Sequence, residues 1–431
     1  MIKKTIETDN IPDIDGKRLP RLCPQLLGQD KICRLFYDNF CNQQLHHAWL
    51  LSGQKGIGKA SFAYQFARFL LHWQTPEKAQ QALTDAAELK DATESPAHQL
   101  YVPPDSSTTQ LVNARAHPDL LVITRAWDSK NGSFKERISV DSTRQIHSFL
   151  SRTAGMGGWR ICIIDSADDL SPSAANALLK IVEEPPDKAL FLIISHQPTG
   201  LLPTLRSRCQ HAPMPPLSTE SVTTLLTRYL KDDMKKSDIE KGDIENADLP
   251  TDLSAENIET IAYLAGGSIG RALAIAEADG LQIYRKMTEL LAKMPHVHRD
   301  ALYQFADQVN QRKRGQGDSL YALYTGLLSD WLHRLVRLGA GVSPFAVNGV
   351  NGATDTNGTN DMNDSETDKF SALFERESKI MHQLIAAASL PQWVEVWEKT
   401  AHYHRQVIQL NLDRRQTILE CFALIKTAAK P

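Results

Sequence analysis

The sequence predicts an α/β fold in which a parallel sheet carries helices on both faces, followed by two helical domains. The first half alternates continuous apolar runs with segments of helical periodicity, a pattern typical of buried parallel strands and their covering helices. A glycine-rich loop ending in lysine joins the first apolar run to the first of these helices. After Pro215 and Pro216 the apolar periodicity becomes wholly helical.

Strands and helices can be placed from these patterns. We expect a helix over 58–72, a second that Asp141 begins and caps with its carboxylate, and a third with Ser171 as N-cap and Pro172 in its first turn, ending before Pro185. Strands are expected at 47–53, 119–125, 160–167 and 189–195.

The chain has 431 residues, which at about 150 residues per domain suggests three domains. The predicted core covers 1–216, the small helical lid 217–280 and the last helical domain 281–431. Three polar stretches interrupt these domains. They are a surface insertion at 75–116, a flexible charged loop at 231–250, and a Gly-, Asn- and Asp-rich segment expected to be disordered at 341–368.

The composition excludes several classes of protein. The formal net charge is −3, so any contact with DNA is expected from a local patch or through partners rather than from a basic coat. The six cysteines form no C-x-x-C pair, which argues against a zinc ribbon or a disulfide framework. No signal peptide and no run long enough to span a bilayer are expected. We therefore expect a cytoplasmic protein without membrane contact.

The strongest motif lies between the first strand and the next helix. Gly53, Gly56, Gly58 and Lys59 have the spacing of a phosphate-binding loop, in which glycines turn backbone amides toward phosphate oxygens. Lys59 is expected to reach the terminal phosphates. The alternative is a chance glycine- and lysine-rich turn, which the flanking strand and helix disfavour.

Two positions needed for hydrolysis are changed. A working loop has Ser or Thr after the lysine as a Mg²⁺ ligand, whereas this chain has Ala60, and Ser61 is rotated by ~100° along the helix. Asp165 ends a buried strand where the Mg²⁺-side carboxylate belongs, but the following residue is Ser166, a poor general base. Asp165 could instead only end the strand, and the nearby Asp168 could be a helix cap.

Two arginines are further candidates. Arg208 follows the 189–195 strand and its loop, where a fixed guanidinium can reach a neighbouring active site. Spacing alone favours a solvated surface pair with Arg206. Arg271 lies in the first turn of a helix that Gly266, Gly267 and Ser268 introduce. It could reach back to the phosphates or be exposed on a tight turn.

Several stretches together resemble the clamp-loader branch of the AAA+ family over roughly residues 20–280. The run NALLKIVEEPP, followed by a strand and then Ser207-Arg208-Cys209, is specific to this branch. The other stretches that carry the resemblance are HHAWLLSGQKGIGKAS, GGWRICIIDSADDLSPSAANALLKIVEEPP, ALFLIISHQPTGLLPTLRSRC and GGSIGRALAIAE.

The resemblance implies an AAA+ P-loop core, a helical lid and an all-α C-terminal collar. It implies a hetero-oligomeric ring with gamma/tau and delta subunits, which acts on the sliding clamp and primed DNA as part of the DNA polymerase III holoenzyme. Arg208 would be a trans-acting arginine finger, Gly28-Gln29 would lie near the base, and Arg271 would be a sensor. Relatives with zinc carry four cysteines that 71–118 lacks, so we expect no zinc.

The losses at Ala60 and Ser166 set this chain apart from the ATP-hydrolysing subunits of the branch. We therefore expect no required cofactor, weak binding of ATP or ADP, and no hydrolysis by the chain itself. Two alternatives remain open. The chain could be an active AAA+ motor of the gamma/tau type, or a remodeller of proteins unrelated to replication.

The last helical domain carries aromatic residues and arginines without a clear motif. Trp331, Trp393 and Trp397 are expected to pack in a core, because the last two share a helix face at a spacing of four. Three arginines there, at 405, 414 and 415, are expected on a solvated face.

Overall fold

The computed structural model forms two compact units, Met1–Ser221 and Val222–Pro431. The break between them lies close to the predicted end of the core at residue 216. The division of the second unit into lid and collar stays a prediction. The structure describes residues 19–23, 26–81, 100–128, 133–240, 254–310, 319–342, 371–410 and 412–430.

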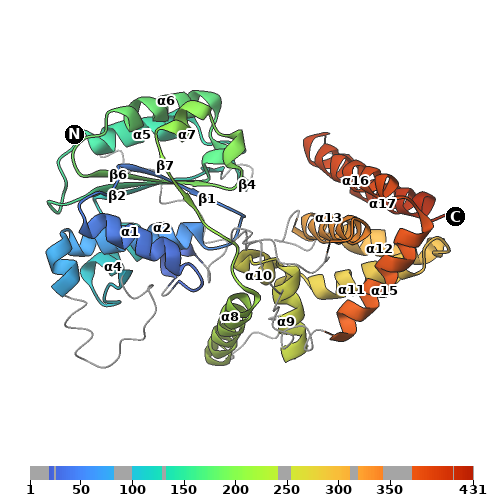
Figure 1. The fold of residues 1–431 in the computed structure, drawn as a ribbon. Coiled ribbons are helices and arrows are strands. Elements are labelled where there is room, and N and C mark those ends of the chain that lie inside the picture. The colour runs from blue at the N-terminus through green and yellow to red at the C-terminus, as the bar shows by residue number, and fades with distance from the viewer. Residues whose placement is uncertain are drawn as a thin grey trace, which may run out of the picture. The chain divides into compact units, whose positions relative to one another are not determined.

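The first unit is built on a five-stranded parallel sheet with the order β2-β5-β6-β1-β7 (Figure 1). The four predicted strands are confirmed within a few residues at each end. The edge strand β7 was not predicted, because it is short, mostly exposed and ends in proline. The strands are β1 (Ala48–Ser52), β2 (Leu120–Ile123), β5 (Arg160–Asp165), β6 (Ala189–Ser195) and β7 (Gln210–Pro213).

Helices cover both faces of this sheet, as the sequence predicts (Figure 1). Alternate residues of β1 show the two-sided burial, since Trp49 and Leu51 pack on one helical layer and Leu50 on the other. One layer contains η1 (Pro20–Leu22), α1 (Asp30–Cys41), α2 (Lys59–Trp73) and α4 (Ser107–Asn113). The other contains α5 (Val140–Leu150), η3 (Ala167–Asp169), α6 (Pro172–Glu183), η4 (Pro198–Gly200) and α7 (Pro203–Ser207).

The predicted surface insertion at 75–116 is partly core. Ala79, Leu100 and Val112 are buried against the layer of α1 and α2, and Arg68 of α2 donates to the Asn113 side chain at 3.3 Å. Isolated apolar residues in a polar stretch give no periodic signal, which is why the sequence did not reveal this packing. Residues 82–99 of the insertion lie outside the described residues.

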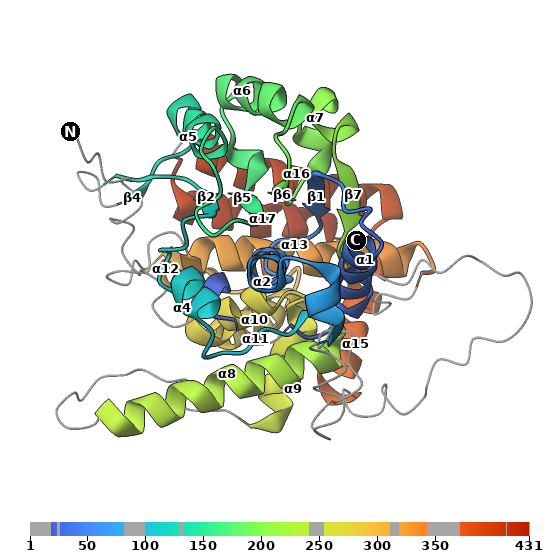
Figure 2. The ribbon, with the colours of Figure 1, turned by 90° about the vertical axis from the view of Figure 1, so that its left-hand side faces the viewer.

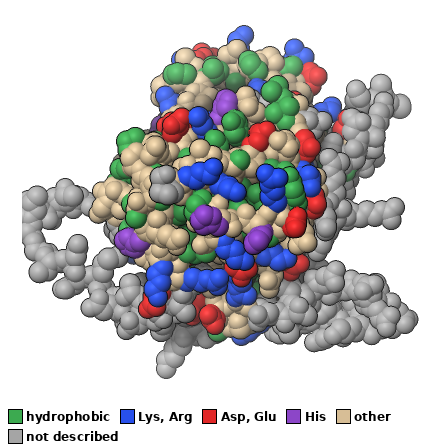
Figure 3. All heavy atoms as spheres, turned by 90° about the vertical axis from the view of Figure 1, so that its right-hand side faces the viewer, with side chains coloured by type: hydrophobic (Ala, Val, Ile, Leu, Met, Phe, Trp, Pro, Cys, Tyr) green, Lys and Arg blue, Asp and Glu red, His purple; other side chains and the backbone are tan. Residues whose placement is uncertain are grey.

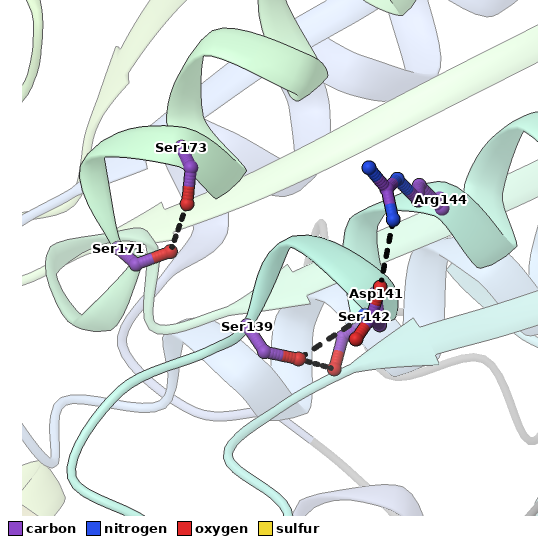
Figure 4. Close-up of polar contacts among 6 residues, drawn as sticks. All are labelled: Ser139, Asp141, Ser142, Arg144, Ser171 and Ser173. Carbon is purple, nitrogen blue, oxygen red and sulfur yellow. Dashed lines mark hydrogen bonds and ion pairs between the residues drawn. The ribbon is translucent and has the colours of Figure 1, made fainter.

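Two helix starts, those of α5 and α6, lie side by side (Figure 4). The parallel bridge between Ile138 and Leu170 joins the segments that lead into them. Ser171 caps α6 as predicted, with its hydroxyl accepting from the Ala174 amide. The predicted cap of α5 was wrong.

The hydroxyl of Ser139, not the carboxylate of Asp141, accepts from the Ser142 amide at the start of α5. Asp141 lies one residue inside the helix and pairs with Arg144 at 3.0 Å (Figure 4). An N-cap residue needs extended backbone, and Ser139 has it, with φ −80° and ψ 161°.

A two-stranded ribbon precedes α5. It pairs β3 (Trp127–Asp128) with β4 (Ser133–Phe134), and the rings of Trp127 and Phe134 meet edge to face. The guanidinium of Arg125 lies over the Phe134 ring and also pairs with Asp169 at 3.3 Å. The ribbon is therefore tied to the segment that follows β5.

The second unit is helical. Its first helix, α8, continues through residues 231–240, so the start of the predicted charged loop is helical instead (Figure 2). Lys, Glu and Asp are tolerated in exposed helices, so low hydrophobicity alone did not exclude one. Residues 241–253 and 343–370, which include most of the predicted disorder, lie outside the described residues. The helices are α8 (Thr219–Glu240), α9 (Ala255–Leu264), α10 (Ile269–Glu277), α11 (Gly280–Ala292), α12 (Arg299–Asn310), α13 (Ser319–Gly339), α15 (Ser371–Ala387), α16 (Leu390–Leu410) and α17 (Arg414–Ala428).

The tryptophans of the second unit pack as predicted. Trp331 and Trp393 are fully buried, and the Trp393 indole donates to the Leu384 carbonyl at 3.1 Å. Trp397 is half-buried and stacks on the ring of His333. These side chains therefore help to hold α13, α15 and α16 together.

The three arginines expected on a solvated face are engaged more than the sequence suggested. Arg415 pairs with Asp307, and the guanidinium of Arg414 lies over the Tyr321 ring, whereas Arg405 is exposed. On the face drawn in Figure 3, Lys and Arg side chains lie together with some acidic side chains among them. In the described part of the chain, no helix combines the length and apolarity needed to cross a membrane.

The capping of α5 can be tested by substitution. We expect Ser139→Ala to lower the free energy of unfolding by about 1 kcal/mol, because the Ser142 amide loses its acceptor. Asp141→Ala is the matched control and should cost less, since an exposed pair of this kind contributes about 0.5 kcal/mol. Denaturant unfolding of the full chain measures both. A larger loss for Asp141→Ala would restore the carboxylate as the cap.

Candidate functional site

The glycine-rich loop lies at the carboxyl end of β1 and depends on glycine at its first position. Gly53 has φ +146°, and a Cβ there would overlap the carbonyl oxygen of Met214. Gly56 and Gly58 also have positive φ, +83° and +98°. Glycine adopts these conformations without the strain that a side chain would add. The three glycines named from the sequence thus shape one loop, which leads directly into α2.

Lys59, the last residue of the loop, is buried, with 3% of its surface exposed. Its ammonium donates to the carbonyls of Gly53 at 2.5 Å and Gln54 at 2.6 Å. Burial lowers the pKa of Lys59 to about 8, although the charges of Asp168 and Asp165 favour the protonated form. The lysine therefore lies inside the loop that would surround a phosphate, and contact with phosphate stays a prediction.

The residues that follow the lysine lack the expected metal ligand. Ala60 presents a methyl group that packs against the core of the α1–α2 layer. Ser61, the next residue, is half-buried in the first turn of α2. A Mg²⁺ ion held beside a phosphate prefers oxygen ligands, which a methyl group does not supply. The donor set therefore fits phosphate better than it fits a magnesium–nucleotide complex.

Asp165 is the last residue of β5. It lies at the carboxyl edge of the parallel sheet, where the glycine-rich loop also lies. Burial raises the pKa of Asp165, and the charge of Lys59 opposes that shift. Ser166 follows with φ +67°, a left-handed backbone that is uncommon outside glycine. A carboxylate near the lysine is thus present, but the next residue is a serine on a tight turn.

Asp168 does not cap α6, the reading that the sequence left open. Its carboxylate accepts from the Ser195 hydroxyl at 2.7 Å and from the amides of His196 at 2.6 Å and Gln197 at 3.1 Å. Burial alone would favour the protonated acid, but these hydrogen bonds lower the pKa of Asp168. The residue instead ties the end of β6 to the turn after β5.

Sequence reasoning also missed His196. Burial and the positive charge of Lys59 lower the pKa of His196 to about 4, so its imidazole is neutral near pH 7. The imidazole of His196 therefore lies close enough to the loop for the charge of Lys59 to affect its pKa. A signal was present, because polar residues that follow a buried strand of a parallel sheet tend to meet at the carboxyl edge.

Gln29 connects the loop to the segment after β7. It is buried, and its amide donates to the carbonyl of Pro215 at 3.0 Å and more weakly to that of Ile57 at 3.4 Å. The side chain of Gln29 thus braces the loop backbone. Its predicted proximity to a nucleotide base stays a prediction.

Arg208 directly follows α7 and is held by two groups of the same unit. Its guanidinium donates to the Thr204 carbonyl at 2.9 Å and pairs with Glu183 at 2.7 Å. The residues at either side of this turn, Leu205 and Cys209, are buried and fix the backbone. Burial also raises the pKa of the Cys209 thiol to about 12, so the cysteine is a packing residue. Arg208 is therefore partly exposed on a rigid turn.

Arg271 belongs to the second unit. Ser268 caps α10 by accepting from the Arg271 amide at 3.1 Å, as predicted for this helix start. The guanidinium of Arg271 pairs with Asp330 of α13. Its predicted approach to the phosphates stays a prediction.

The part of the chain that the structure describes contains no group of three His, Cys, Asp or Glu side chains arranged to hold a metal ion. All six cysteines are unbridged. The expectation that the chain needs no zinc stays a prediction.

The electrostatic link between the loop and His196 can be measured. Because the charge of Lys59 lowers the pKa of His196, we expect Lys59→Met to raise that pKa from about 4 toward its usual value. His404 is the internal control, since burial alone lowers its pKa to about 4. NMR titration of the imidazole protons follows both. An unchanged His196 together with an unchanged His404 would place the ammonium away from the ring.

The first half of the chain is similar in sequence to known subunits of DNA polymerase III. A family model described as DNA polymerase III, delta subunit, matches residues 28–218. The delta' subunit of Pseudomonas aeruginosa DNA polymerase III is 32% identical over 222 residues, 52% of this chain and 53% of the relative. The delta' subunit of Escherichia coli is 28% identical over 247 residues, 57% and 59% of the two chains.

The gamma/tau subunit of Mycobacterium tuberculosis is 28% identical over 217 residues, which are 50% of this chain and 32% of that protein. The chain thus spans about half the length of the delta' subunits above. Residues 28–218 therefore match the DNA polymerase III delta-subunit family, and this part of the chain is similar to bacterial delta' subunits.

Proposed function

We propose that this chain is a delta-prime-type subunit of the DNA polymerase III clamp loader, which does not hydrolyse ATP itself. Its partners in this proposal are gamma/tau and delta subunits, in a cytoplasmic hetero-oligomer that places the sliding clamp on primed DNA. The match of residues 28–218 supports the family part of the proposal. The replacement of two catalytic positions supports the lack of hydrolysis.

The observation that carries the loss of hydrolysis is the residue after Lys59. Ala60 offers no oxygen to a metal, and Ser166 offers no carboxylate to activate water. The glycines and Lys59 keep a phosphate-sized loop, so the chain would bind ATP or ADP weakly and require no cofactor. Each missing group alone impairs metal-assisted hydrolysis, and both losses point the same way.

Arg208 supplies the active part of the proposal. Its guanidinium would enter the ATP site of a neighbouring gamma/tau subunit and stabilise charge on the transferring γ-phosphate. Its partial exposure and the buried residues on both sides suit that task. Arg206 lies in the same turn but bonds weakly to the Pro198 carbonyl at 3.5 Å.

A second candidate is an ATP-hydrolysing motor of the gamma/tau type. The complete glycine spacing of the loop and the similarity to gamma/tau subunits favour it. The two candidates predict different behaviour of the isolated chain toward magnesium and ATP.

We expect the purified chain to show no magnesium-dependent ATP hydrolysis. Introducing the missing ligand with Ala60→Thr should make nucleotide binding tighter in Mg²⁺ than in EDTA, and the Ala60→Thr/Ser166→Glu variant tests whether turnover returns. Fluorescent-nucleotide titration and phosphate release measure the two effects. Robust turnover by the unmodified chain would favour the motor.

Arg208→Ala should impair hydrolysis by the complex with gamma/tau and delta. At the site that Arg208 completes, we expect the rate to fall roughly 10³-fold, the contribution typical of such arginines. The clamp- and DNA-stimulated rate of the whole complex would fall to that of its remaining sites. Arg206→Ala is the matched control, and gel filtration checks assembly. An Arg208→Ala complex as fast as the wild type would exclude the arginine finger.

A further inference from the structure

Arg208 pairs with a charged residue of α6, Glu183, for which the proposed function gives no role. Glu183 is the last residue of α6, and one of its carboxylate oxygens lies 2.7 Å from a terminal nitrogen of Arg208. The other terminal nitrogen donates to the Thr204 carbonyl at 2.9 Å. The two helices α6 and α7 therefore each hold one side of the guanidinium.

These contacts leave the guanidinium able to bind something else. Arginine has five N–H donors, and the two described contacts occupy two of them. The Arg208 side chain is 38% exposed and that of Glu183 is 43% exposed. The arginine is thus held at both terminal nitrogens, and its three other N–H donors belong to a side chain that is partly open to solvent.

The placement of Glu183 is unfavourable for α6 considered alone. A helix C-terminus carries partial negative charge, so a carboxylate in the last turn is disfavoured unless a cation lies beside it. Arg208 supplies that cation. Glu184, the next residue, is also exposed, and no contact with Arg208 is described for it. Glu183 is therefore distinguished from its neighbour by its geometry and not by its charge.

We propose that Glu183 is a positioning residue that orients Arg208 before the neighbouring subunit arrives. This inference rests on the proposed function of Arg208 as a finger. A long exposed side chain samples many rotamers, and ordering it on assembly costs free energy. Because Glu183 and Thr204 order the guanidinium in advance, that cost is met when the chain folds, and the arginine enters the ATP site already aligned.

The test uses the full complex with gamma/tau, delta, clamp and primed DNA. It compares wild type with Glu183→Ala, Glu183→Gln and Arg208→Ala, and measures the turnover number and the KM for ATP. Glu184→Ala is the matched control. Glutamine keeps an oxygen that accepts from the guanidinium, so it separates the hydrogen bond from the charge.

We expect Glu183→Ala to lower the part of the turnover number that depends on Arg208 by about 2- to 10-fold, the effect of ordering one long side chain. The KM for ATP should stay unchanged. Glu183→Gln should recover most of the rate, and Glu184→Ala should match the wild type. Because Glu183 acts through the arginine, Glu183→Ala/Arg208→Ala should be no slower than Arg208→Ala.

Different failures have different meanings. If Arg208→Ala lowers the rate but Glu183→Ala does not, positioning by Glu183 is wrong and the arginine finger remains. If Arg208→Ala has no effect, the proposed function fails and this inference fails with it. Faster turnover in both Glu183 variants would make the carboxylate a restraint, which also overturns positioning. A double variant slower than Arg208→Ala would indicate that loss of Glu183 causes a general structural defect. That result would also overturn positioning.

Discussion

The pairing of β1 with β6 on one side and β7 on the other is the constraint on which the candidate site depends. Parallel strands bring their carboxyl ends to one edge, so the loop after β1 meets the residues that follow β5 and β6. For this reason the charges of Asp168 and Asp165 raise the pKa of Lys59 against the effect of burial, and the charge of Lys59 lowers the pKa of His196. A change in the strand order would separate these groups even if every side chain were kept.

Long periodic signals made much of this arrangement predictable. The continuous apolar runs of β5 and β6 reflect local requirements, as does the glycine spacing of the loop. The structure confirms both strands. Features decided by tertiary contact were not predicted. The edge strand β7 has no apolar run, and the task of Asp168 depends on the distant amides of His196 and Gln197. The cap of α5 depended on which of two residues, Ser139 or Asp141, had the extended backbone that an N-cap needs.

Two ways of holding a cation are present in the first unit. Lys59 is enclosed by carbonyls of its own loop, so its charge is largely turned inward. Arg208 is held by one carbonyl and one carboxylate, and its side chain is partly exposed. The ammonium of Lys59 is thus directed into its own loop, whereas the guanidinium of Arg208 belongs to a partly exposed side chain. This difference supports the proposal that the chain binds nucleotide only weakly and that Arg208 acts on a neighbouring subunit.

The close approach of Gly53 to Met214 has a consequence for how such sequences change over time. The packing of the loop against the segment after β7 requires glycine at position 53, whether or not a nucleotide ever binds. A related chain without catalysis would meet the same steric requirement at this position. A glycine-rich loop between a strand and a helix is therefore weak evidence for catalytic activity, because packing alone is enough to require its first glycine.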